Sequence, residues 1–219
     1  TAWTFGMEEP LAMESIRAIA KEIAPDQVNV TASVDKTEIN YGEAISLNSL
    51  FAIKDKSPLV NVPIKIQARS ATDGTWRLLS TVSTNTEGKI EKSLILGKST
   101  TVRLYTESTW ERSEGISQEI PITVLRRIVI DPPTSIKSGK PVVLTGSARP
   151  RTAGTSVVLE KLVNNEWQIV DESATTDANG QFTFTLPAQS RSVMTLRISL
   201  REDTDWAAVT GQEFNIIIR

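Results

Sequence analysis

The sequence predicts an all-β protein made of two β-sandwiches in series, preceded by a short amphipathic α-helix. Apolar and polar residues alternate through most of the chain, which is typical of strands buried on one face. One pattern of strands and turns occurs twice in the same order, which indicates an internal repeat. The first 27 residues break this pattern and have the spacing of a helix.

The composition narrows the classes of function. The chain has 219 residues, 24 basic and 26 acidic, and its net charge of −2 gives no general attraction to nucleic acid. It contains no Cys and no His, which excludes disulfides, thiolate or imidazole metal sites and Ser-His-Asp catalysis. No run reaches the roughly 18 apolar residues that cross a bilayer. The sequence therefore predicts no catalytic residue, no metal site, no cofactor, no nucleic-acid partner and no transmembrane segment, and so not an enzyme.

The repeat is visible when the chain is compared with itself. The stretch "TEINYGEAISLNS" around Gly42 matches "TSIKSGKPVVLTGS" around Gly139. Further on, Trp76 precedes a turn glycine by twelve positions, and Trp167 precedes its own by thirteen. The copies finish in "QEIPITVLR" and "QEFNIIIR". Such agreement along both copies predicts two modules of the same architecture.

Each copy has the length and strand density of an immunoglobulin-like sandwich, with about seven short strands in just under a hundred residues. We therefore divide the chain into residues 1–27, residues 28–126 (sandwich 1) and residues 127–219 (sandwich 2). The junction "IPITVLRRIVIDPP" contains no Gly/Ser linker. Because flexible linkers need such a composition, we expect the pair to behave as a short rod.

One stretch of the second copy carries a family resemblance. The run "EWQIVDESATTDANGQFTFTL", residues 166–186, resembles the bacterial Ig-like tandem repeats of exported and surface proteins, in which a Trp-bearing strand precedes Thr-Asp-x-x-Gly-x-Phe. The first copy departs from the motif at its turn and has Ile90 where Phe is usual. The resemblance implies an all-β fold, an extracytoplasmic bacterial setting and a role as spacer, adhesin module or accessory domain. It implies no reaction.

The segment Asp177–Gly180 has two interpretations. Its Asp-x-Asn-Gly lettering matches the start of a calcium loop, but calcium needs six to eight oxygens, and no bidentate Glu follows within the strand. A tight turn with glycine in the left-handed region joins two strands without any metal. We favour the turn.

Three tryptophans are candidate platforms for a flat ligand such as a sugar: Trp110, Trp167 and Trp206. Trp167 opens a strand after a tight turn, where packing in the core or at a sheet edge is the simpler interpretation. Trp110 and Trp206 lie in loops before the last strand of each copy, and the simpler interpretation has each ring covering the end of its own sandwich. Acidic residues beside Trp206 could act in catalysis only with a partner across a cleft.

The N-terminal segment is the candidate docking element. Pro10 and acidic residues open the predicted helix, Pro25 follows its end, and Ile16, Ile19 and Ile23 share one face. Trp3 and Phe5 add apolar surface just before it. Either sandwich 1 covers this stripe, or a partner protein or a second copy of the chain does. We favour docking.

These observations lead to two functional hypotheses. The first is a non-catalytic structural or adhesive module of a cell-surface or envelope assembly that docks through its N-terminal helix. The second is a pair of glycan-binding accessory domains in a secreted glycan-active protein. The sequence favours the first.

Overall fold

The protein is all-β throughout its named elements, as predicted. The computed structural model describes residues 13–14, 16, 25–53 and 57–219. Within them, eighteen strands form four sheets, which pair into sandwich 1 (β1–β9) and sandwich 2 (β10–β18). The described part of the chain contains no helix with the length and hydrophobicity of a membrane-spanning segment.

Sandwich 1 consists of the three-stranded sheet β1-β3-β6 and the six-stranded sheet β2-β9-β7-β4-β5, in which β8 also pairs with β7. Its strands are β1 (Asn29–Val34), β2 (Glu38–Asn40), β3 (Ala44–Ala52), β4 (Pro63–Ser70), β5 (Arg77–Ser83), β6 (Lys89–Ile95), β7 (Thr100–Thr106), β8 (Gly115–Ile116) and β9 (Ile120–Leu125).

Sandwich 2 consists of the three-stranded sheet β10-β12-β15 and the six-stranded sheet β11-β18-β16-β13-β14, in which β17 also pairs with β16. Its strands are β10 (Arg127–Ile130), β11 (Ser135–Ile136), β12 (Val142–Arg149), β13 (Val157–Val163), β14 (Glu166–Asp171), β15 (Gln181–Leu186), β16 (Ser192–Leu200), β17 (Val209–Thr210) and β18 (Phe214–Ile218).

The two sandwiches share one topology, strand for strand. In each, the second strand runs parallel to the last one (β2 to β9, and β11 to β18), while the other pairs are antiparallel. Each also has a β-bulge between its fourth and fifth strands. The sequence repeat is therefore a structural repeat, and a residue of one sandwich has a definite equivalent in the other.

Alternation of burial explains why these segments form strands. In β15, and in β3 as far as Phe51, every second side chain is buried, so one face of each strand lies on the core and the other faces solvent. Leu47 and Ile64 belong to the core cluster of sandwich 1, and Phe184 and Leu196 belong to that of sandwich 2. Each core is therefore closed between its own two sheets.

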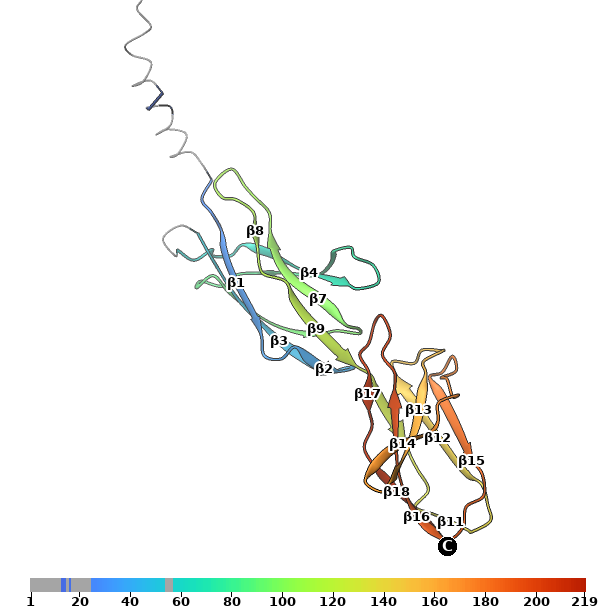
Figure 1. The fold of residues 1–219 in the computed structure, drawn as a ribbon. Coiled ribbons are helices and arrows are strands. Elements are labelled where there is room, and N and C mark those ends of the chain that lie inside the picture. The colour runs from blue at the N-terminus through green and yellow to red at the C-terminus, as the bar shows by residue number, and fades with distance from the viewer. Residues whose placement is uncertain (1–12, 15, 17–24, 54–56) are drawn as a thin grey trace, which may run out of the picture.

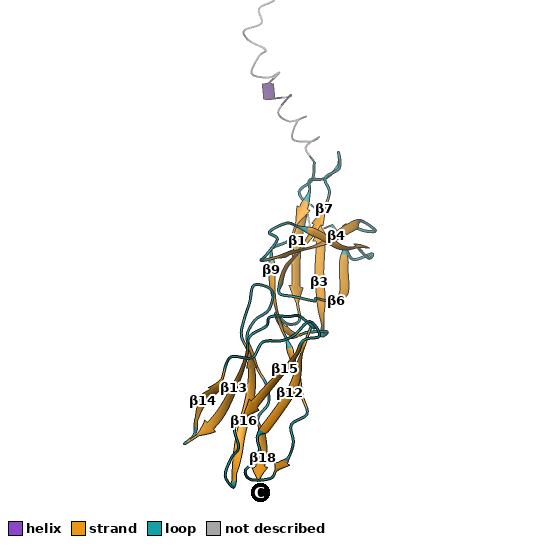
Figure 2. Cartoon of the chain, turned by 90° about the vertical axis from the view of Figure 1, so that its right-hand side faces the viewer, coloured by secondary structure: helices purple, strands orange, loops and turns teal. Residues whose placement is uncertain are grey.

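The sandwiches lie end to end along one axis, with sandwich 2 carrying the chain's C-terminus at its far end (Figures 1 and 2). The last strand of sandwich 1 ends at Leu125 and the first strand of sandwich 2 begins at Arg127. Arg126 alone separates them. The handover has no flexible linker, so contacts between the two ends determine how the sandwiches are joined.

Candidate functional site: the joint between the sandwiches

Three segments that lie far apart in the sequence meet where the sandwiches touch. The turn between β6 and β7 (residues 96–99) and the end of β9 (residues 124–126) belong to sandwich 1. The loop between β16 and β17 (residues 201–208) rises from sandwich 2 toward them (Figure 1). We call the contact of these segments the joint.

Trp206 is the main apolar contact of the joint. Its half-buried ring packs against the core cluster of sandwich 1, and its indole Nε1 donates a hydrogen bond to the carbonyl of Gly97 at 2.9 Å. The expectation that Trp206 covers its own sandwich is therefore wrong. The ring covers the end of the neighbouring sandwich, because the handover without a linker brings that end within reach of the loop.

Arg126 is the polar centre of the joint. Its side chain is only 1% exposed, and its guanidinium carbon lies 4.7 Å from the centre of the Trp206 ring. One terminal nitrogen donates to the carbonyl of Arg201 at 3.1 Å, and the other is paired with the carboxylate of Asp203. Burial lowers the pKa of Arg126, and the charge of Asp205 opposes this shift. The side chain remains cationic at neutral pH, so the joint contains a buried, partnered charge.

Asp205 connects the loop of sandwich 2 to the turn between β6 and β7 and to Thr72 of sandwich 1. Its backbone carbonyl accepts a hydrogen bond from the Ser99 amide at 2.7 Å, and its carboxylate pairs with Lys98 at 3.2 Å and with the Thr72 hydroxyl at 3.1 Å. Ala207 adds a short parallel bridge to Leu125. The joint thus combines an apolar contact, ion pairs and backbone hydrogen bonds, which together oppose both bending and twisting.

Trp167 lies on an edge strand rather than in the core cluster. It belongs to β14, where the Arg197 guanidinium carbon stacks 4.2 Å from the ring centre, and Arg197 forms two hydrogen bonds of 2.9 Å to Glu160. Trp76, its counterpart before β5, has Arg103 at 4.0 Å and a second arginine at 4.7 Å. The proposed platform is thus already partly occupied by a protein cation.

Trp110 differs from the other two candidates because its side chain is 85% exposed. It lies in the loop between β7 and β8, at the end of sandwich 1 remote from sandwich 2 (Figure 1). The expectation that its ring folds back onto sandwich 1 is wrong. Of the three tryptophans, Trp110 presents by far the most surface to a partner.

The Asp177–Gly180 segment forms a turn. The Asp177 carboxylate accepts hydrogen bonds from the amides of Asn179 and Gln181, both at 2.8 Å, and Gly180 has a φ of +71°. In sandwich 1 the side-chain oxygen of Asn85 accepts the same two kinds of bond. The structure thus contains the turn that the sequence predicts, and a neutral amide makes the equivalent hydrogen bonds in the other copy.

The predicted docking residues lie almost entirely outside the described residues. Of residues 1–24, the structure describes Met13, Glu14 and Ile16, with Met13 46% and Ile16 59% exposed. Trp3, Phe5, Ile19 and Ile23 belong to the remainder, so the helix and its docking role stay predictions.

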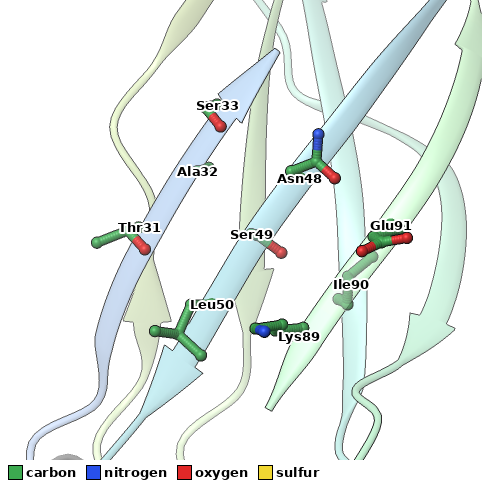
Figure 3. A pocket seen from close by; sticks show the side chains of 9 residues that line it. All are labelled: Thr31, Ala32, Ser33, Asn48, Ser49, Leu50, Lys89, Ile90 and Glu91. Atoms are coloured by element: carbon green, nitrogen blue, oxygen red, sulfur yellow. The ribbon is translucent and has the colours of Figure 1, made fainter. Parts of the chain in front are cut away.

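A shallow cavity of about 350 Å³ lies on the three-stranded sheet of sandwich 1 (Figure 3). Hydroxyl, amide and charged side chains from β1, β3 and β6 line it, among them Asn48, Lys89 and Glu91. The buried Ser49 hydroxyl has no hydrogen-bond partner among the described residues. Neither Glu91 nor Lys89 forms a hydrogen bond with this hydroxyl, so these described residues do not form a paired nucleophile and base.

Sequence reasoning missed the joint. Arg126 stands in the run Leu-Arg-Arg, which indicates an exposed end of a strand, yet its side chain is among the most buried in the protein. The available signal was the missing linker combined with a tryptophan in a loop that faces the neighbouring module.

No protein-family model matches the chain, and no curated protein matches it. Among solved structures, the D0-D1 domain of Intimin is similar, with 18% sequence identity over 86% of this chain and 97% of that chain, and a TM-score of 0.33. A likeness this distant says nothing about function.

Proposed function

We propose that the protein is a non-catalytic structural module, a stiff two-sandwich spacer within an extracytoplasmic cell-surface or envelope assembly. A spacer must hold its two ends at a fixed separation and orientation. The observation that carries the proposal is the joint, in which Trp206 and Arg126 connect the sandwiches through contacts of several kinds. The resemblance of residues 166–186 to repeats of exported bacterial proteins supports the extracytoplasmic placement.

The joint offers a direct test, because a chain without cysteine accepts site-specific labels cleanly. Spin labels at Glu91→Cys in β6 and Thr183→Cys in β15, both exposed, report the distance between the sandwiches by double electron–electron resonance. We expect a single narrow distribution. Trp206→Ala should broaden it, because the ring that fills the end of sandwich 1 is gone.

Trp110→Ala is the matched control, because Trp110 stands in the equivalent loop but faces solvent. It should leave the distribution unchanged. A broad distribution in the unaltered protein would contradict a stiff spacer and leave only two tethered modules.

The glycan-binding hypothesis rests on one observation, the exposed Trp110 ring, since aromatic platforms bind sugars through such faces. Binding of the protein to a glycan array tests this hypothesis. Specific binding that Trp110→Ala abolishes and Trp167→Ala preserves would favour an accessory glycan-binding role over a spacer.

Docking through the N-terminal segment is a further part of the proposal, supported by the exposure of Met13 and Ile16. Removal of residues 1–25 should leave the melting of both sandwiches nearly unchanged and abolish partner capture. A loss of several kcal/mol from sandwich 1 would show instead that the segment is a structural cover.

A further inference from the structure

Trp110 and Trp206 occupy equivalent places in the structural repeat but have opposite environments. Trp206 lies in the loop between β16 and β17, and Trp110 lies in the loop between β7 and β8. In both cases the two strands that flank the loop form an antiparallel pair. Trp206 packs on the end of sandwich 1, whereas Trp110 is 85% exposed. The tryptophan of this loop therefore packs on a neighbouring sandwich at the joint. At the far end of sandwich 1 its equivalent packs on nothing among the described residues.

The loop that carries Trp110 is well ordered by its own hydrogen bonds. The Thr109 amide donates to the carbonyl of Arg112 at 2.9 Å, and the Thr109 hydroxyl accepts from the Arg112 amide at 3.2 Å. Asp26 closes the loop from the other side through 2.9 Å bonds with Glu111 and Ser113. A large aromatic side chain held at the tip of such a loop loses little entropy on binding, which is characteristic of an interface anchor.

The surface that receives Trp206 also recurs. In sandwich 1 it comprises the turn between β6 and β7 and the end of β9, where the Tyr41 amide donates to the carbonyl of Leu125. In sandwich 2 the same end comprises the turn of residues 187–191 and the end of β18, where the Ser138 amide donates to the carbonyl of Arg219. Across the two described sandwiches, this end lies opposite the loop between β7 and β8 (Figure 1).

The charges at the two extremities are complementary. The loop of residues 107–114 carries three glutamates, of which Glu111 and Glu114 are exposed and Glu107 is paired with a lysine, and one arginine, Arg112, so its net charge is negative. The C-terminal end of sandwich 2 carries four exposed cations, none of them in an ion pair within the described residues: Lys137, Lys140, Arg191 and Arg219.

The joint has the same distribution of charge. Its loop contributes Asp203 and Asp205, and its receiving end contributes Lys98 and Arg126. The loop at one end and the strand ends at the other therefore repeat the topology and the overall sign of charge of an interface that already exists within the chain.

We propose that the protein associates head to tail with a second copy of itself. The loop of residues 107–114, anchored by Trp110, docks on the C-terminal end of sandwich 2 of the next molecule and reproduces the joint between molecules. Such a contact joins two different surfaces and does not close, so it builds chains whose length grows with concentration. The loop is small compared with the standard protein interface, so the contact is weak and reversible unless the molecules are held close together.

Sedimentation velocity of the full chain tests the proposal, with the concentration raised a hundredfold to about 1 mM, where weak contacts become populated. We expect the weight-average sedimentation coefficient to rise with concentration and to rise less at high salt, because screening weakens the charge attraction. Trp110→Ala should abolish the rise without changing the melting temperature. Ile169→Ala, which removes another exposed apolar side chain from the flank of sandwich 2, is the matched control and should associate normally.

Charge reversal tests the partner surface. Glu111→Lys alone and the double variant Lys140→Glu with Arg191→Glu should each weaken association, and a mixture of the two proteins should restore it, since the altered loop then meets the altered end. Mixtures that remain as weakly associated as the separate variants would contradict this pairing of surfaces.

Several results would overturn the inference. A chain that stays monomeric over the whole range, or a Trp110→Ala variant that associates like the unaltered protein, would do so. Association lost only on removal of residues 1–25 would favour N-terminal docking, and a glycan bound at Trp110 of a persistent monomer would favour the glycan-binding hypothesis. The distance between the two spin labels across the joint does not depend on self-association. A monomeric protein with a narrow distribution of that distance would therefore leave the spacer proposal intact.

Discussion

The guanidinium carbon of Arg126 lies 4.7 Å from the centre of the Trp206 ring, so a cation at the end of sandwich 1 stacks on an indole from sandwich 2. The same guanidinium binds the carbonyl of Arg201 and the carboxylate of Asp203. One side chain therefore meets an aromatic face, a carbonyl and a charge from a single loop. This explains how a cation in the last position before a new domain is almost completely buried without being isolated.

Trp206→Ala should destabilise sandwich 1, although Trp206 belongs to sandwich 2. The half-buried ring covers the core cluster of sandwich 1, and its loss should cost about 2 kcal/mol of the free energy of unfolding of that sandwich. Hydrogen exchange at the amides of Val102 and Leu104 measures this directly. Trp110→Ala should change the same amides by no more than about 0.5 kcal/mol. Equal effects of the two substitutions would contradict the assigned role of Trp206.

Asp177→Asn should be nearly neutral, and Asp177→Ala should destabilise sandwich 2 by about 1 kcal/mol. The reason is that Asn85 already holds the equivalent turn with an amide oxygen. Thermal melts with excess calcium and with a chelator should overlay in the unaltered protein. A calcium-dependent rise of the melting temperature that Asp177→Asn removes would mean that the carboxylate binds metal.

Gly88→Ala should be far more damaging than Gly42→Ala. Both glycines have positive φ, +73° and +85°, so alanine pays a backbone cost of about 1–2 kcal/mol at either position. A Cβ at Gly88 would also lie 2.4 Å from the carbonyl oxygen of Phe51, whereas nothing lies within 4 Å of one at Gly42. Chemical denaturation should separate the two variants clearly. Similar midpoints would mean that backbone strain alone decides the outcome.

Glu160 should make stability depend on pH. Hydrogen bonds from Arg197 are the main cause that lowers the pKa of the Glu160 carboxyl in the folded state, and burial opposes them. A carboxyl with a lowered pKa stabilises the fold above its unfolded pKa of about 4, and that stability is lost as the pH falls through the folded pKa.

Glu160→Gln should therefore cost on the order of 1.5 kcal/mol at pH 7, and the difference from the unaltered protein should shrink as the pH falls below about 4. Urea denaturation at several pH values measures it. Glu87→Gln, which affects an exposed pair with Lys89, should have little effect at any pH. A deficit at Glu160→Gln that persists unchanged at pH 2 would point to lost packing instead of lost charge.

Local patterns were sufficient to predict the strands and turns of this protein. Alternation in β3 and β15 identifies the buried face of each strand, and the Asp177 turn follows from residues next to one another. The fates of Trp110 and Trp206 could not be predicted in the same way. Both lie in equivalent loops of the repeat, and the ring that is covered belongs to the loop that faces a neighbouring sandwich.

The burial of Arg126 illustrates the same limit. Its partners at residues 201 and 203 lie 75 and 77 positions away, and no period or turn signal links them. The environment of Trp167 could be predicted only in part. Its position on an edge strand follows from the turn before it, but the Arg197 stacked on its outer face comes from a different strand. Alternation in the sequence predicts which face of a strand is buried. It does not predict which side chains from different strands or loops come into contact.

The wide sequence separation of the joint has a consequence for biosynthesis. Sandwich 1 possesses all of its strands once Leu125 has been made, yet the indole that covers its end follows 109 positions after Gly97. A chain made from its N-terminus folds domain by domain. The first sandwich must therefore emerge with an uncovered apolar end, and only completion of the second seals it. Maturation thus has two stages, and a chain interrupted before Trp206 would expose a surface that a finished molecule keeps hidden.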